Sequence, residues 1–290
     1  DDNCTVTDDT TNTVIQLNFI SGFDSTTAIE LDTTTQTATD AYLSSLTASV
    51  SDNATMPATA AAASIASGNN GTTVGAQRKL AFIKAAEILA SKIVSTEPIL
   101  VDADFTTSLG CFNDSATLGS ASASSFLQNA SAPTGALDST WYPVGLYNAL
   151  DGADNYPPSG PLNANPNTVD NASALNADSD VFARYNSLVG TSSCLRYSNG
   201  WYYGFDTPPS TLALDDNGDP LPFTLGGEAP QITYIGFITV LLHEMLHGLG
   251  FSTLTDSSGN ELGSLDDIYA TFLRDDANNR NWNDASESAA

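Results

Sequence analysis

The chain contains only two histidines, His243 and His247, and they stand four residues apart in the string HEMLHGLGF. On an α-helix, residues four apart share one face, so both imidazole rings can offer a nitrogen to one zinc ion. Glu244 would lie beside this ion, where its carboxylate can take a proton from a zinc-bound water and pass it to a leaving amine. The spacing therefore predicts a site that hydrolyses peptide bonds, with His243 and His247 as metal ligands and Glu244 as the catalytic residue.

The alternative interpretation is that two core histidines happen to flank a glutamate. With two histidines and seven glutamates in 290 residues, chance produces this five-residue pattern in roughly two of 10,000 such sequences. The alternative would also leave Glu244 buried without a partner in an apolar helix, at a cost of several kcal/mol. The metal interpretation is therefore the stronger one.

The motif lies within residues 232–251, the longest apolar stretch of the chain. Its length alone would suit a membrane-spanning helix, but two histidines and a glutamate inside it argue against contact with lipid. We predict a buried helix, after which Gly248 and Gly250 let the chain end and turn sharply. The side that faces the core is expected to consist of Ile235, Ile238, Leu242 and Leu249.

Several further elements are expected to support this helix. Alternating apolar residues predict strands at 13–20 and 99–105, and residues 181–185 are another candidate strand. Residues 74–94 predict an amphipathic helix, and the short apolar segment 141–150 also favours a helix. The helix at 74–94 would carry Phe82, Ala86, Leu89 and Ile93 on its apolar face, and Arg78, Lys79, Lys84 and Lys92 elsewhere.

A single domain is expected over residues 1–290, because this length can bury a sizeable core. Residues 1–67 are assigned to an N-terminal strand and a Thr-, Ala- and Ser-rich excursion, and residues 68–290 to the core. The segment 215–219 resembles a calcium loop but lacks the ligand spacing of an EF-hand, so we expect a polar turn there. Calcium stays open as a second cofactor.

Three cysteines, Cys4, Cys111 and Cys194, leave one thiol unpaired within the chain. We hypothesise a disulfide between Cys111 and Cys194. The chain begins Asp-Asp-Asn-Cys, with no initiator Met and no basic or apolar leader segment. We therefore expect that a signal peptide has been removed and that the protein is secreted.

The charge balance narrows the range of partners. Thirty-four Asp and Glu residues stand against eight Lys and Arg, which gives a formal net charge of -26. Such a surface repels nucleic-acid phosphates and anionic lipid, so neither nucleic acid nor a membrane is an expected partner. Since apolar residues make up 41% of the chain, a folded protein is expected rather than disorder. Its expected partners are protein or peptide substrates, and it is expected to be a monomer.

The string at residues 243–251 resembles the HExxHxxGF variant of the metzincin pattern, as in leishmanolysin-type enzymes. The chain is more closely similar to a family of secreted, mostly bacterial zinc metalloendopeptidases with an HExxHGLGF core. The likeness extends to GTTVGAQR at 71–78, ATLGS at 116–120, FARYNS at 182–187 and WYYG at 201–204.

This resemblance implies an α+β fold, a metzincin-like zinc peptidase domain. Such a domain has a mixed twisted sheet, a backing helix (here 74–94) and an active-site helix beneath an open substrate cleft. The resemblance also implies an edge strand above the metal that pairs with extended substrate, for which residues 181–187 are the candidate.

The chain departs from the full metzincin pattern, which would place a third ligand six residues after the second histidine. That position is Thr253, and the methionine turn is missing too. Relatives of this kind can carry the third ligand much later, so either the chain ends before it or a carboxylate completes the site. We favour C-terminal incompleteness, because residues 279–290 are polar and have no pattern of a strand or helix. The carboxylate candidates are Glu261, Asp266 and Asp267.

A secreted zinc-dependent endopeptidase is therefore the leading expectation. A catalytically silent, peptidase-like acidic binding module is the alternative from another class, and the missing third ligand is the feature that supports it. A gluzincin-type hydrolase, with Glu261 as a ligand on a following helix, is a third hypothesis.

Overall fold

The structure is a computed structural model, and it describes residues 3–21, 29–32, 66–112, 115–128, 135–154, 168–170, 179–190, 194, 200–206, 234–255, 261, 265–276 and 280–281. Most of the excursion expected before residue 68 and the whole of the segment 215–219 lie outside these residues.

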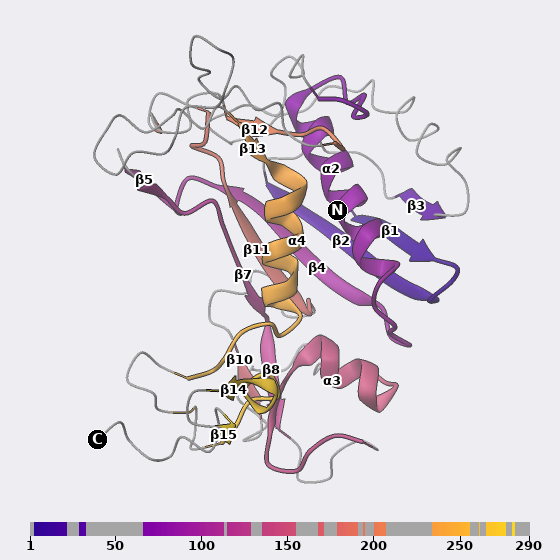
Figure 1. Cartoon of the computed structure of the whole chain (residues 1–290). Coiled ribbons are helices and arrows are strands. Elements are labelled where there is room, and N and C mark those ends of the chain that lie inside the picture. Colours follow the sequence, from indigo (N-terminus) through magenta and orange to yellow (C-terminus); the bar gives the residue numbers. More distant parts are fainter. Residues whose placement is uncertain are drawn as a thin grey trace.

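Six strands form a mixed, twisted sheet in the order β3-β1-β2-β4-β11-β7 (Figure 1). The strands β2, β4 and β11 run parallel, whereas β7 is antiparallel to β11 and β1 is antiparallel to β2. The strands expected at 13–20, 99–105 and 181–185 are confirmed as β2, β4 and β11. The bounds are β1 Asn3–Asp8, β2 Thr13–Ser21, β3 Ile29–Asp32, β4 Ile99–Thr106, β7 Gly119–Ala123 and β11 Val181–Asn186.

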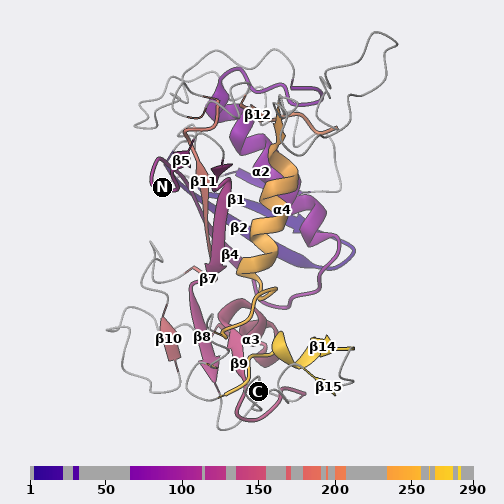
Figure 2. The same cartoon turned by 60° about the vertical axis from the view of Figure 1, so that its left-hand side comes forward.

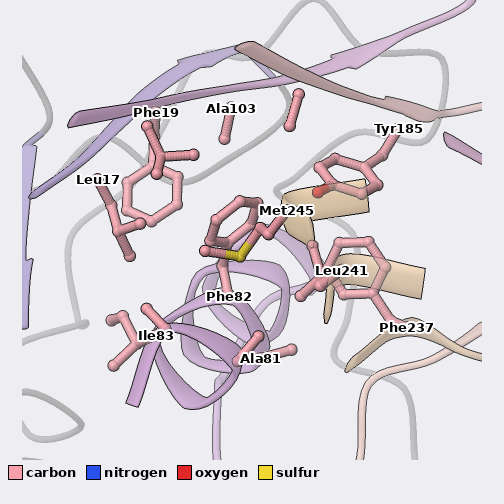
Figure 3. Packing of buried hydrophobic residues seen from close by; sticks show 14 of the residues in the cluster. Leu17, Phe19, Ala81, Phe82, Ile83, Ala103, Tyr185, Phe237, Leu241 and Met245 are labelled. Carbon is pink, nitrogen blue, oxygen red and sulfur yellow. The ribbon is translucent and has the colours of Figure 1, made fainter. Parts of the chain in front are cut away.

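Two helices, α2 (Val74–Ala90) and α4 (Phe237–Gly248), lie on the same face of this sheet and contact each other (Figures 1 and 2). Their apolar side chains meet those of the strands in one core, where Phe82 of α2, Leu241 and Met245 of α4 and Tyr185 of β11 come together (Figure 3). The expectation of an α+β fold with a mixed twisted sheet is thus confirmed at this level.

Helix α2 has a defined start and end. The side chain of Thr73 accepts a hydrogen bond from the N–H of Ala76 at 3.1 Å, which caps the first turn. The helix ends at Ala90, before the expected residue 94, and hydroxyls of the β1–β2 turn and of β2 bind carbonyls at and just after its end. Thr11 donates to the carbonyl of Ala90 and Thr13 to that of Ile93, both at 2.8 Å.

The prediction that α2 carries its cations away from the core is wrong for two of them. Arg78 and Lys79 are each only 1% exposed. The guanidinium of Arg78 donates to the Tyr203 hydroxyl at 3.1 Å and lies 4.1 Å from the centre of the Phe105 ring. The faces of aromatic rings attract cations, so these two cationic side chains can be buried on a helix that packs against the protein on nearly all sides.

A second, smaller sheet lies at one end of the first (Figure 2). The chain passes from β7 into it through a single residue, Ser124, and the helix α3 (Val144–Asp151) packs against β8 and β9. The segment 141–150 is therefore only partly helical, because Trp141–Pro143 pairs as a strand first. The three strands are β8 Ser125–Gln128, β9 Trp141–Pro143 and β10 Thr168–Asp170.

The remaining described elements are short. The pairs are β5 (Cys111–Phe112) with β6 (Ser115–Ala116), β12 (Trp201–Tyr202) with β13 (Ile235–Gly236), and β14 (Arg274–Asp275) with β15 (Arg280–Asn281). The 3-10 helix η3 covers Ala270–Phe272.

The Cys111–Cys194 disulfide is present, as hypothesised, and Cys4 is buried and forms no disulfide within the described residues. Within the described residues, none of the helices combines the length and the apolar character that crossing a membrane requires.

Candidate metal centre

Helix α4 presents one side to the core and the other to solvent. Its buried residues are Phe237, Leu241, Glu244, Met245 and Gly248, of which all but Glu244 form a line at helical spacing toward the core. The expected core side is confirmed only in part: Ile235 is in the core but belongs to β13, and Ile238, Leu242 and Leu249 are partly buried and pack against the edge of the core. The sequence is apolar around most of this helix, so its periodicity did not single out the buried line.

Two glycines end the helix as expected. Gly248 leaves no room for a side chain, because a Cβ there would collide with Val181 of β11. Gly250 has φ +107°, and a Cβ there would lie 2.6 Å from Cγ of Pro143. The N–H of Phe251 then donates back to the carbonyl of Leu246 at 3.0 Å, which closes the turn. This turn places the carbonyl of Phe251 beneath His247.

The two histidines converge on the outer side of α4. Their Nε2 atoms are 3.0 Å apart, and their rings lie nearly perpendicular at 88°. The Nδ1 of His247 is 2.8 Å from the carbonyl oxygen of Phe251. Because a carbonyl can only accept, Nδ1 of His247 carries a proton and donates it, so the lone pair that His247 can offer to a metal lies on Nε2, which faces Nε2 of His243.

This geometry fits a zinc ion. Two zinc–nitrogen bonds of about 2.0–2.1 Å at a tetrahedral angle separate the nitrogens by about 3.3 Å. The observed 3.0 Å differs by only a few tenths of an ångström. An imidazole that donates its second ring N–H to a carbonyl is also the common arrangement of zinc-binding histidines. His243 and His247 can therefore hold zinc from a solvent-facing position.

Glu244 lies on the adjacent face of the helix, between the two histidines and β7, and is only 8% exposed. Its carboxylate accepts a hydrogen bond from the backbone N–H of Ala121. Burial raises the pKa of the Glu244 carboxyl above its usual value, whereas His243, His247 and the Ala121 N–H act in the opposite direction. Burial and then the Glu244 charge raise the pKa of the neighbouring Tyr185 hydroxyl well above its usual value.

The three carboxylates considered as a third ligand have other contacts. Asp267 accepts from the N–H of Leu254 at 2.7 Å and from that of Ala270 at 2.8 Å, so both of its oxygens are engaged in local structure. Glu261 hydrogen-bonds to Asp266, and burial raises the pKa of Glu261. Among the described residues, no three His, Cys, Asp or Glu side chains gather into a group that could hold a metal ion.

The strand beside the site differs from the expected one. Residues 181–187 were the candidate edge strand, but β11 pairs with β4 on one side and with β7 on the other. Of the described strands, β7 is the edge next to α4. Its sequence GSASA has small side chains throughout and lacks the alternation of large apolar and polar residues that marks a half-buried strand.

Comparisons with protein-family models, with curated proteins and with solved structures find no match. The functional assignment therefore depends on the chemistry and geometry of these residues.

Proposed function

We propose that this chain is a secreted zinc-dependent endopeptidase of metzincin-like architecture. The observation that carries the proposal is the convergence of the Nε2 atoms of His243 and His247 to 3.0 Å, with Glu244 between them in the sequence. Zinc bound there supplies a Lewis acid that polarises a peptide carbonyl and makes water more acidic.

The side chain of Glu244 has the properties of a proton carrier. It is the residue next to His243, and burial raises the pKa of its carboxyl toward the working range of a general base. In the proposed reaction its carboxylate takes a proton from the attacking water and returns it to the nitrogen of the leaving amine. His243 and His247 would hold the zinc ion, and neither transfers the proton.

The surrounding elements support the metzincin-like architecture and a peptide substrate. A backing helix, α2, and the motif helix, α4, cover one face of a mixed sheet, and the sheet ends beside α4 in the antiparallel strand β7. An unpaired strand edge can bind an extended peptide by main-chain hydrogen bonds. The Cys111–Cys194 disulfide supports a place in an oxidising compartment, as secretion requires.

The decisive experiment is the Glu244→Gln variant of the zinc-loaded protein. We expect casein hydrolysis to fall by at least about 1,000-fold, because an amide cannot accept the proton, while zinc content stays near one per chain. The matched control is Glu87→Gln, which removes a carboxylate that pairs with Lys84 on α2, far from the motif in sequence. Full hydrolysis by Glu244→Gln would contradict the mechanism.

A catalytically silent binding module is the second candidate. The observation that favours it is the lack of a third ligand in the described part of the chain. Elemental analysis and casein cleavage with and without a chelator distinguish the two candidates. A protein that takes up no zinc and cleaves nothing would favour the binding module.

A further inference from the structure

We propose that strand β7 positions Glu244: Gly119 leaves the space that the Glu244 side chain occupies, and the backbone amide of Ala121 holds its carboxylate. This inference rests on the proposed function, in which Glu244 is the general base. It assigns to Gly119 and Ala121 a positioning role that acts through Glu244.

The pairing of β7 with β11 leaves the Ala121 amide available for this role. The N–H of Asn186 donates to the carbonyl of Leu118, and the N–H of Ser124 donates to that of Asp180, both at 2.9 Å. Bonded positions recur at every second residue of an antiparallel ladder, so residues 118, 120, 122 and 124 bond to β11. The main-chain groups of Gly119 and Ala121 therefore point away from β11, and the N–H of Ala121 can donate to Glu244 without breaking the ladder.

The missing side chain of Gly119 makes room for the carboxylate. A Cβ at residue 119 would lie 2.7 Å from Cγ of Glu244 and 3.0 Å from both Cδ and Oε1. No real Cβ has a neighbour at 2.7 Å, so an alanine there forces a shift. Its three nearest atoms all belong to the flexible side chain of Glu244. Glu244 is therefore expected to move while the backbone of β7 stays in place.

Tyr185, which pairs with Gly119 across the ladder, borders the same space. Gly119 pairs with Tyr185, whose ring is fully buried in the core next to α4. In the described residues, the Tyr185 hydroxyl has no hydrogen-bond partner, and it interacts electrostatically with Glu244. Gly119 and Tyr185 thus border the Glu244 side chain at the level of residue 119, and the Ala121 amide acts on its carboxylate from two residues further along β7. In the proposed reaction, the Glu244 carboxylate would therefore transfer its proton at one fixed position along the edge of the sheet.

The test compares Gly119→Ala and Ala121→Pro with Ser120→Thr in the full chain. Proline removes the N–H of residue 121 at an edge position where the ladder does not need it. Ser120→Thr also adds one methyl group, but on the opposite face of β7, where Ser120 is exposed. We expect both positioning variants to lower kcat about 10- to 100-fold with little change in KM and full zinc content. Ser120→Thr should keep the wild-type kcat.

A second readout does not depend on activity. In the metal-free protein, the amide proton of Ala121 should resonate downfield and be protected from hydrogen exchange. In Gly119→Ala and in Glu244→Gln it should move upfield and exchange about tenfold faster or more, because a charge-assisted hydrogen bond is lost. An unchanged Ala121 amide in both variants overturns the positioning role. Full hydrolysis by Glu244→Gln, with a shifted Ala121 amide, would instead refute the proposed function and leave the positioning contact standing.

Discussion

His247 is oriented by a main-chain group that lies beyond the helix on which it sits. The carbonyl of Phe251 accepts from its Nδ1, and the ring then points its Nε2 at His243. The Phe251 side chain plays no part in this contact, since only its backbone oxygen is used. The proposed metal site would thus depend on the turn after α4 as well as on the spacing of the two histidines.

At this scale we predict that His247→Ala loses zinc. A site deprived of one of its imidazoles binds the ion far more weakly, so zinc should fall from near one per chain to near zero after dialysis. Elemental analysis of the purified protein measures this. Phe251→Ala, which keeps the carbonyl, should retain its zinc; equal zinc in His247→Ala and wild type would contradict the ligand assignment.

The convergence of the two histidines is the part of the candidate site that the sequence predicts best. The spacing of His243 and His247 is enough to place both rings on one helix face, because helical geometry is local. The contacts of Glu244 with Gly119 and Ala121 could not be predicted in this way. They depend on which strand becomes the edge of the sheet, and that is decided by long-range pairing. The ring–cation contact that buries Arg78 was missed for the same reason.

At the scale of elements, the sharp end of α4 is the feature on which the site depends. Gly250 combines a positive φ with close approach to Pro143 of β9, so it joins the motif helix to the smaller sheet. Any side chain there must adopt an unfavourable backbone conformation and also push Pro143 away. The turn, and with it the Phe251 carbonyl, would then shift.

We predict that Gly250→Ala destabilises the protein by about 2–4 kcal/mol and weakens zinc binding. Gly135→Ala is the matched control, because Gly135 has a similar φ of +96° with nothing within 4 Å of its added Cβ. It should cost only about 1–2 kcal/mol of backbone strain and leave zinc affinity unchanged. Urea unfolding and zinc titration measure both effects. Equal losses in the two variants would mean that the contact with Pro143 is unimportant.

Strands in which apolar and polar residues alternate were predicted well. Elements whose structure depends on pairing with distant strands were not. Ile15, Leu17 and Phe19 alternate with polar residues and identify β2, and the same pattern identifies β4. Residues 141–143 are as apolar as the helix that follows them, and only pairing with β8 makes them a strand. Small-residue strands such as β7 carry no periodic signal at all.

At the scale of the whole molecule, a buried aspartate ties the two sheets together. Asp180 immediately precedes β11, and its carboxylate accepts from the N–H of Leu100 at 2.8 Å and from the side chain of Asn148, in α3, at 3.2 Å. Burial raises the pKa of Asp180 from 3.8 to about 6; the nearby Asp154 adds to the rise, and the two hydrogen bonds oppose it.

A dependence of stability on pH follows from this raised pKa. Between pH 3.8 and about 6 the unfolded chain has lost the Asp180 proton and the folded chain has kept it. The free energy of unfolding should therefore fall as pH rises through this window, by up to about 3 kcal/mol. Asp180→Asn should lack this fall, and urea unfolding at pH 4 and pH 7 measures it. Asp9→Asn, at an exposed turn, should keep it; a fall of the same size in Asp180→Asn would exclude Asp180 as its source.

The net charge of -26 is also distributed unevenly between surface and core. Among the described residues, two of the eight cationic side chains, Arg78 and Lys79, are buried, and so are the four acidic residues Asp102, Asp180, Glu244 and Asp267. The excess of acidic groups therefore remains on the solvent-facing surface. Composition alone predicts the sign of the surface charge but cannot show where the few cationic side chains lie. Such a surface repels other acidic macromolecules over about a Debye length.

The close approach of Gly119 to Glu244 has a consequence for how these two positions vary in evolution. A side chain at residue 119 and a glutamate at residue 244 compete for one volume, so the two positions cannot vary independently. A lineage that acquires alanine at 119 would come under pressure to shorten or lose the acid at 244. Related sequences should therefore show glycine and glutamate kept as a pair or lost as a pair, although the two residues lie far apart along the chain.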